Sequence, residues 1–175
     1  MGITANYQRL SPEKFEEICR NSEAADTFFG YELEDDEFDA WFDELEASGR
    51  YLDIGKAWHG LHFLLTGSSD INDVLPPFGN VVMGGTDTQW ESPYGMVRYL
   101  TPQEVKNCAQ ALEQMNETQL RRCYRPMAFR AADIYPNGKT WGENDIDYLI
   151  IMVDRVRTFF SEAAKAGEVV LISID

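Results

Sequence analysis

The end of the chain contains its strongest structural pattern. Between Glu143 and Ala166, apolar residues recur at the spacing of one helical face, and Gly167 follows as a typical helix-ending residue. Residues 168–174, EVVLISI, then form a nearly continuous apolar run with the composition of a buried β-strand. Because a long amphipathic helix feeds directly into this strand, we expect helices that pack on a sheet.

Weaker patterns extend this fold prediction to the whole chain. We expect strands near residues 3–10, 80–85 and 95–100, and helices that begin after Ser11, Thr101 and Asn116, each of which can cap a helix N-terminus. Strands and helices do not alternate regularly, so a parallel βαβ fold is disfavoured. The prediction is an α+β fold, with a small mixed sheet packed with several helices in a single compact domain over residues 1–175.

Charge is concentrated in the first third of the chain. The formal net charge is −15, and residues 13–53 hold fifteen acidic and three basic residues. Such a surface repels phosphate backbones, so we expect no nucleic-acid binding. It suits a basic protein partner, or it serves only to keep the protein in solution.

An acidic helical segment at about residues 26–49 combines this charge with aromatic residues. Phe38, Trp41, Phe42 and Leu45 share one helical face, and most of the acids point elsewhere. The plain interpretation is an acidic amphipathic helix laid on the core. The alternative is an exposed surface that binds a basic protein through Trp41 and Phe42, or that imitates the charge of DNA.

Several functional classes are disfavoured by what the sequence contains. No run approaches the roughly 20 apolar residues of a membrane helix, and the first residues do not resemble a secretory signal. The three cysteines are widely spaced and form no CxxC pair, which favours reduced thiols over disulfides. We therefore predict a cytoplasmic protein without membrane contact, and no cofactor.

The segment LDIGKAWHGLHFLLTG, residues 52–67, contains the only two histidines. We expect Asp53 to cap a helix in which His62 lies at the margin of the apolar stripe and His59 lies further round. Zinc needs three or four protein ligands, and no third candidate is close in sequence, so we predict no metal site.

This segment resembles the signature of the YfbM-like family, a bacterial domain of unknown function. The matching residues are Leu52, Asp53, Lys56, Trp58, Leu61, His62, Phe63, Leu65, Thr66 and Gly67. Further similarity lies in Gly84-Gly85, in Ile134-Tyr135-Pro136 and in the final helix and strand, so it spans most of the chain. The resemblance implies a compact α+β fold and a bacterial origin, and it implies no reaction. The acidic segment and His59 lie outside the shared pattern.

Two glycine loops are candidate contact surfaces. Thr66, Gly67 and Ser68 follow the histidines, and Gly84 and Gly85 end the strand expected at residues 80–85. Backbone N–H groups in such loops can bind an anion, but neither loop has the spacing of a nucleotide-binding motif. A basic cluster of arginines at 121, 122, 125 and 130 could bind an anion, although pairing with the acidic segment, within the molecule or across a dimer, is the preferred interpretation.

Two hypotheses of function follow. The first is a non-enzymatic, immunity-like or otherwise binding protein that contacts a basic partner through its acidic aromatic helix. The second is a small hydrolase in which His62 acts with Asp53 or Asp133, in a pocket closed by Trp58 and Tyr135. Geometry discriminates between them, because an enzyme needs His62 in a pocket beside a carboxylate, and a binding protein needs Trp41 or Phe42 exposed among carboxylates. The sequence predicts no oligomeric state.

Overall fold

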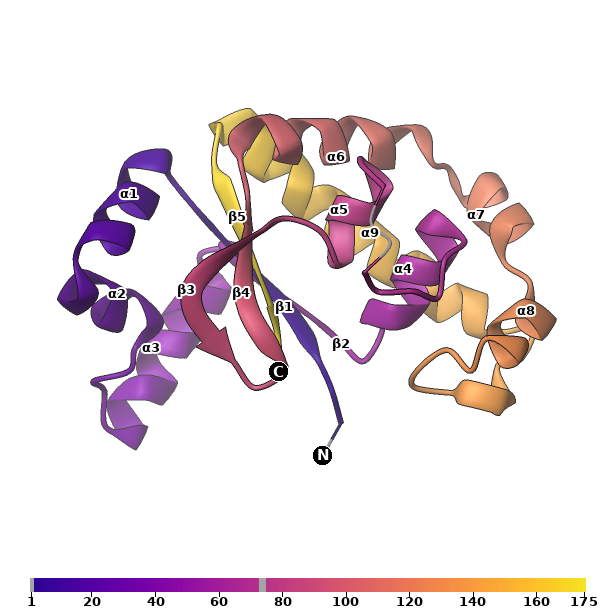
Figure 1. Ribbon diagram of the computed structural model, residues 1–175, viewed down its shortest axis with the longest axis horizontal. Helices are drawn as coiled ribbons and strands as arrows, with labels where there is room; N and C mark the ends of the chain where they lie inside the picture. Colours follow the sequence, from indigo (N-terminus) through magenta and orange to yellow (C-terminus); the bar gives the residue numbers. More distant parts are fainter. Residues whose placement is uncertain (1, 73–74) are drawn as a thin grey trace.

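The computed structural model describes residues 2–72 and 75–175. Within them, five strands form one sheet in the order β2-β1-β5-β4-β3 (Figure 1). The strands are β1 Ala5–Leu10, β2 Tyr51–Gly55, β3 Thr86–Ser92, β4 Gly95–Leu100 and β5 Val169–Ile174. The α+β class predicted from the sequence is confirmed.

The sheet is antiparallel, and the expectation of a mixed sheet was wrong. Each of the four strand pairings runs antiparallel. A tight turn at Pro93-Tyr94 joins β3 to β4 and forces these two strands to run in opposite directions. Strand β5 lies between β1 and β4 and runs opposite to both, so none of the pairings among the described strands is parallel.

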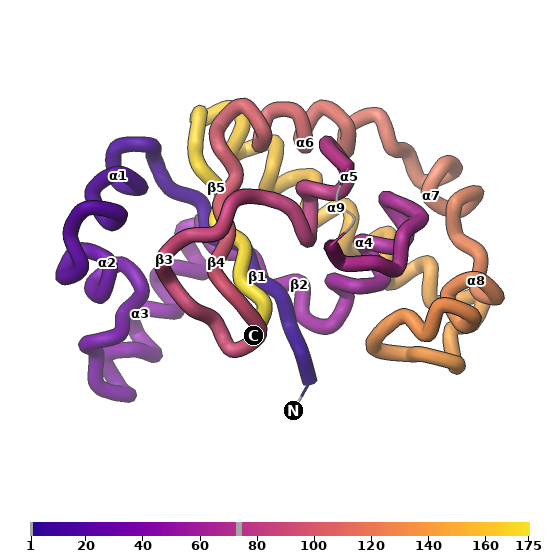
Figure 2. The backbone as a smooth tube through the Cα atoms, in the orientation of Figure 1, coloured from indigo at the N-terminus to yellow at the C-terminus, as the bar shows by residue number. Residues whose placement is uncertain are grey.

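Helices cover both faces of the sheet. On one side are α1 Pro12–Arg20, α2 Ser22–Phe29 and α3 Asp35–Ala47. The other side carries α4 Trp58–Thr66, α5 Phe78–Val82, α6 Pro102–Gln114, α7 Glu117–Cys123, α8 Pro126–Ala131, a 3-10 turn at Gly138–Thr140 and α9 Asp145–Ala166. Figures 1 and 2 show these two groups on opposite sides of the strands. No helix of the described residues is both long enough and apolar enough to cross a membrane.

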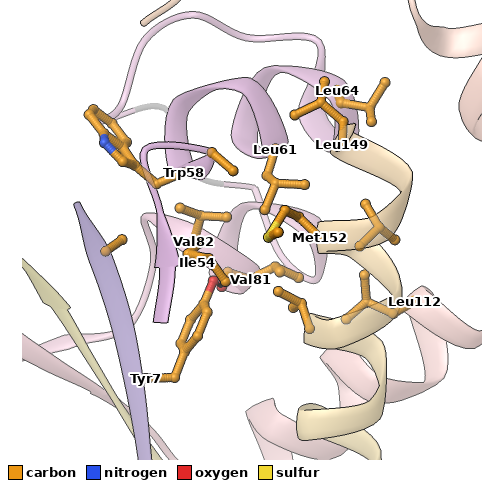
Figure 3. Close-up of a cluster of buried hydrophobic side chains, with 14 of the residues drawn as sticks. Tyr7, Ile54, Trp58, Leu61, Leu64, Val81, Val82, Leu112, Leu149 and Met152 are labelled. Atoms are coloured by element: carbon orange, nitrogen blue, oxygen red, sulfur yellow. Dashed lines mark hydrogen bonds between the residues drawn. The ribbon is translucent and has the colours of Figure 1, made fainter. Parts of the chain in front are cut away.

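The larger core lies between the sheet and helices α4, α5, α6 and α9 (Figure 3). Tyr7 enters it from β1 and donates a hydrogen bond from its hydroxyl to the Val81 carbonyl at 2.7 Å. Leu61 and Leu149 bring α4 and α9 together in the same cluster. The apolar face predicted for the final helix is therefore the face that this core buries.

A smaller core lies on the opposite face of the sheet, under α1 and α2. It is built from Leu10, Ile18, Ala25, Val97, Val169 and Leu171. Just before β5, the buried carboxylate of Glu168 pairs with Arg9 at 2.9 Å and with Arg50 at 3.2 Å. Because Arg50 follows α3 directly, this ion pair fixes the point where α3 returns to the sheet.

Helix α3 does not extend this second core. None of its residues is buried. The interpretation of an acidic helix laid on the core was therefore wrong, although the helix itself was predicted correctly. The aromatic residues of α3 lie beside the sheet and are only partly covered: Trp41 and Phe42 are half-buried, and Phe38 is exposed.

Two local predictions failed because short apolar runs do not distinguish helix from strand. Residues 80–85 were expected to form a strand, and the chain instead forms α5, whose C-terminal carbonyls of Val82 and Met83 accept hydrogen bonds from Arg98. Asp53 was expected to cap a helix and instead lies in the middle of β2, paired with Asn6 of β1. Helix α4 begins only at Trp58.

Candidate functional site

Helix α4 carries both histidines, and each contacts the loop that follows the helix. His59 Nε2 lies 3.3 Å from the Ser69 carbonyl oxygen, and His62 Nε2 lies 3.3 Å from the Asp70 carbonyl oxygen. A carbonyl only accepts hydrogen bonds, so each Nε2 carries the hydrogen. The three-residue spacing thus lets two imidazoles hold two successive carbonyls of one loop.

Both histidines are arranged to stay neutral. His59 Nδ1 accepts a hydrogen bond from the Tyr135 backbone N–H at 3.1 Å, which a protonated Nδ1 could not do. His62 is fully buried, and its Nδ1 has no hydrogen-bond partner in the part of the chain that the structure describes. Burial lowers the pKa of both imidazoles below the ordinary histidine value, and for His62 the nearby His59 and Arg98 lower it further.

Trp58 and Tyr135, the two candidate pocket residues, lie together. The Trp58 ring stacks on His59 with centroids 5.0 Å apart, and it lies 5.8 Å from the Tyr135 ring. Trp58 is buried, and its Nε1 donates to the Ile3 carbonyl at 3.1 Å. This aromatic cluster therefore joins α4, the turn before Pro136 and the segment before β1.

Neither candidate carboxylate accompanies His62. Asp53 is exposed on β2, where its carboxylate accepts the Gly55 N–H at 2.6 Å. Asp133 is exposed and lies 3.8 Å from the Lys139 ammonium. Within residues 2–72 and 75–175, no hydrogen bond or ion pair joins His62 to either carboxylate, and no group of three or more His, Cys, Asp or Glu residues is placed to hold a metal ion.

The first glycine loop is organised by its own hydrogen bonds. Thr66 donates from its hydroxyl to the His62 carbonyl at 2.7 Å and accepts the Ser68 N–H at 3.1 Å. Gly67 closes α4 in the left-handed conformation with φ of 74°, which glycine adopts without strain. These contacts account for all three residues as the end of a helix.

The second glycine loop is explained by close packing. A Cβ at Gly84 would lie 2.1 Å from Asn80 Oδ1, and Asn80 is buried. Gly85 has φ of +97°, and a Cβ there would lie 2.8 Å from the Tyr99 carbonyl oxygen. Both glycines are thus required by neighbouring atoms of the protein itself.

A groove with different properties lies between α3 and the nearby face of the sheet, with a volume of about 390 Å³. We call it the α3 groove. Its aromatic wall consists of Phe38, Trp41 and Phe42 with Leu45 from α3, joined by Phe29 and Tyr31. Its floor comes from β1, β2 and β5, and its far rim comes from the β3–β4 turn; these residues include Asn6, Gln8, Tyr51, Leu171, Ser173, Asp175, Glu91, Ser92 and Pro93.

The aromatic wall is accessible and is set among acids. Phe38 is 38% exposed, and Trp41 and Phe42 are half-buried. The acidic residues of α3 are all exposed, and its first turn begins with Asp35, Asp36 and Glu37. Figure 1 shows α3 beside the sheet, away from the helices of the larger core.

The floor of the α3 groove contains a fixed carboxylate. Ser173 Oγ donates to Asp175 Oδ1 at 2.8 Å, and Asn6 Nδ2 donates to the other oxygen. Burial raises the pKa of Tyr31 and of Tyr51, and the negative charge of Asp175 raises both further. The groove thus combines rings that are partly shielded from water with a carboxylate held by two neutral donors.

Comparisons with known proteins place this chain in a family. A family model described as a domain of unknown function, DUF1877, matches residues 1–173. The chain belongs to the DUF1877 family. A solved structure with the same fold is YfbM from Escherichia coli, a protein of unknown function, which is 20% identical with a TM-score of 0.70 over 98% of this chain and 99% of that one. No match was found among curated proteins.

The resemblance to YfbM-like proteins that the sequence suggested is confirmed, and the structure gives its central segment physical roles. In this DUF1877 member, Leu52 and Leu61 belong to the larger core, while Trp58, His62 and Thr66 hold neighbouring backbone carbonyls. The segment thus builds strand β2, helix α4 and the anchor of the following loop.

Among the residues that the structure describes, the basic cluster does not pair with the acidic segment within the molecule. Arg121 pairs with Glu117 at 2.8 Å and with Asp147 at 2.7 Å. These two acids lie in the first turns of α7 and α9. Figures 1 and 2 show α7 and α3 at opposite ends of the molecule. In the described part of this DUF1877 chain, no ion pair links the two regions.

Sequence reasoning grouped the four α3 residues of the groove wall on one helical face, with Trp41 and Phe42 as the candidate contacts, and missed the floor of the groove. Asn6, Ser173 and Asp175 come from opposite ends of the sequence and meet because β1 pairs with β5. The available signal was alternation, since Asn6 and Gln8 alternate with Ala5 and Tyr7 in β1, and Ser173 is the one polar residue of β5. When the strand pairing is unknown, polar residues on one face of a strand indicate only that this face is exposed to solvent.

Proposed function

We propose that this DUF1877 protein is a non-enzymatic binding protein that contacts a basic protein through α3 and the α3 groove. The observation that carries the proposal is that the aromatic residues of α3 line an open groove instead of joining either core. Aromatic side chains provide a large contact area when a partner covers them, and they are enriched at interfaces for that reason.

The charge around the α3 groove indicates the class of partner. Residues 13–53 hold fifteen acidic and three basic residues, and α3 presents its acids to solvent. A positive partner would be attracted before contact, which raises the association rate, and negative partners would be repelled. This supports a basic protein, and an immunity-like or inhibitory role would use the same surface.

The geometry of His62 supports binding over hydrolysis. The enzyme hypothesis requires an accessible imidazole within reach of a carboxylate. His62 is 0% exposed, its Nε2 is occupied by the Asp70 carbonyl, and within the described residues neither Asp53 nor Asp133 contacts it. The aromatic wall comes nearer to the binding condition, because Phe38 is exposed and Trp41 and Phe42 are half-buried beside the exposed acids of α3.

We place this activity in the cytoplasm. Cys19 and Cys123 are exposed free thiols, and Cys108 is a buried one. Exposed free thiols are typical of proteins that work in a reducing compartment. Reduced Cys19 and Cys123 in protein isolated from its native cells would support the placement, and a disulfide at either would contradict it.

A selection from a random peptide library tests the binding role. The wild-type protein is immobilised, and bound peptides are compared with those retained by the double variant Trp41→Ala/Phe42→Ala. We expect the wild type to enrich peptides rich in Lys and Arg and the variant to lose this enrichment.

The matched control removes exposed apolar side chains elsewhere. Tyr148 and Ile151 are 45% and 56% exposed on α9. The variant Tyr148→Ala/Ile151→Ala should select the same basic peptides as the wild type. Enrichment of acidic or neutral peptides, or equal enrichment by the Trp41→Ala/Phe42→Ala variant, would contradict the proposal.

A further inference from the structure

Given the binding role proposed above, we propose that the α3 groove recognises an arginine side chain of the basic partner, with its guanidinium against the aromatic wall and paired with Asp175. The proposal goes beyond the general charge of the surface. It assigns one recognised side chain and one carboxylate that selects it.

Asp175 is prepared to accept a cation. Its two carboxylate oxygens each accept one hydrogen bond, from Ser173 and from Asn6. A carboxylate offers about four acceptor positions, so both oxygens retain capacity for further donors. Within the described residues no Lys or Arg forms an ion pair with Asp175, so its charge is not neutralised by the protein.

The aromatic wall provides the second half of the site. Phe38 lies 5.3 Å from Trp41 and 6.1 Å from Phe42 between ring centroids, and Phe42 lies 5.0 Å from Tyr51. Three of these rings come from α3 and one from β2, so the cluster extends from the wall of the groove to its floor. A cation near aromatic faces is attracted by their quadrupoles, and more strongly when water is excluded.

An apolar occupant fits this groove poorly. Covering the groove with apolar side chains would remove water from the Asp175 carboxylate without replacing its lost interactions, which is costly for an ionised group. Glu91 on the opposite rim adds a second negative charge to the same groove. The groove therefore favours an occupant with an apolar stem and a positive end.

Arginine suits both the aromatic wall and the Asp175 carboxylate better than lysine does. Its guanidinium is planar, stacks on aromatic rings and can donate two parallel hydrogen bonds to one carboxylate. A lysine ammonium is a compact and strongly hydrated charge that gains less from an aromatic wall. The expected order of affinity is arginine, then lysine, then the neutral isostere citrulline.

Three fluorescein-labelled peptides test this order: (Gly-Arg)₄, (Gly-Lys)₄ and (Gly-citrulline)₄. Fluorescence anisotropy with the full-length protein should give at least about tenfold tighter binding of the arginine peptide than of the citrulline peptide, and about threefold tighter than of the lysine peptide. The variant Asp175→Asn should reduce the preference for arginine over citrulline by about tenfold.

The matched control is Asp43→Asn, which removes the same charge from an exposed position on α3 that does not line the groove. It should reduce arginine-peptide binding by less than about twofold, as a screened surface charge does. Unfolding by urea shows whether each variant is as stable as the wild type. If Asp175→Asn destabilises the fold, Asp175→Glu should restore the arginine preference.

The outcomes separate the two proposals. If the wild type binds basic peptides but Asp175→Asn behaves like Asp43→Asn, or if lysine and arginine bind equally, the arginine site is refuted and the binding role stands. If neither basic peptide binds the wild type, or if Trp41→Ala binds them equally well, the binding role is refuted with it.

Discussion

Raising the pH from 5.5 to 7.5 should stabilise this protein through His59 and His62. Burial lowers the pKa of both imidazoles in the folded state, while the unfolded chain titrates near the ordinary value of about 6.5. Between the folded and unfolded pKa values, the unfolded state therefore binds more protons. Stability is fully present above the unfolded pKa and falls as the pH drops towards the folded pKa.

The uptake of one proton by each histidine sets the upper limit of this effect. Each histidine contributes at most about 1.4 kcal/mol per pH unit, so the pair contributes at most about 2.7 kcal/mol per unit. A proton on His59 Nδ1 would displace the Tyr135 N–H, and one on His62 Nδ1 would place an unpaired charge beside Arg98 in the interior. Ordinary carboxylates titrate near 4, below this window, and contribute little to the slope.

Urea unfolding at half-unit pH intervals measures the slope, and the double variant His59→Gln/His62→Gln is the control. Glutamine can donate from Nε2 to the same loop carbonyls but does not titrate. The wild type should gain stability from pH 5.5 to 7.5, and the variant should be nearly flat. An equal slope in both proteins, or a wild type that is more stable at pH 5.5, would refute the histidine arrangement.

Three further substitutions test the placement of α3 and α6. Gly30→Ala should cost about 1–2 kcal/mol, because φ is +70° and the new Cβ meets the Trp41 ring at 3.2 Å; Gly49→Ala, with φ of +68° and open space, should cost less in the same urea titration. Trp41→Ala should cost about 1–2 kcal/mol of unfolding free energy, because Trp41 is only half-buried. Truncating a fully buried tryptophan costs about 3–5 kcal/mol, so a loss in that range would place Trp41 in the core. Arg157→Met should cost about 1–3 kcal/mol of unfolding free energy, because the Arg157 guanidinium donates hydrogen bonds to the last carbonyls of α6. The control Arg155→Met changes an exposed arginine of the same helix and should alter stability by less than about 0.5 kcal/mol. Equal losses in the two variants would contradict this role of Arg157.

Local chemistry predicted helix starts well. Ser11, Thr101 and Asn116 each accept a hydrogen bond from the first turn of a helix, as their side chains indicated. The apolar periodicity of α9 and the apolar run of β5 were also sufficient, because both are long enough to exclude the alternative structure. Helix caps and apolar periodicity depend on residues that are close together in the sequence, so both can be recognised before the structure is known.

Elements fixed by distant contacts were not predictable in the same way. Strand β2 exists because β1 pairs with it, and nothing within residues 51–55 distinguishes it from the start of a helix. Helix α5 ends where Arg98, more than ten residues away, holds its carbonyls. Such contacts override local propensity and are known only after the chain has folded.

The candidate site shows the same division. The helical wheel correctly placed His59 and His62 at different positions around α4. Only the structure shows that both imidazoles hydrogen-bond to carbonyls of the loop after α4. Trp41 and Phe42 could be named from the pattern of α3, whereas their exposure depends on how far α3 lies from the sheet. Asp175 could not be named, because its role depends on strand pairing across the full length of the chain.

The most direct test of binding at the α3 groove uses fluorine NMR. The chain has four tryptophans, of which Trp41 lines the groove, while Trp58 and Trp141 lie in the larger core. The protein is labelled with 5-fluorotryptophan, the Trp41 resonance is assigned with Trp41→Phe, and (Gly-Arg)₄ is added. The Trp41 resonance should shift progressively while those of Trp58 and Trp141 stay fixed. A stationary Trp41 resonance with bound peptide, or a larger shift at Trp58, would contradict binding in the α3 groove.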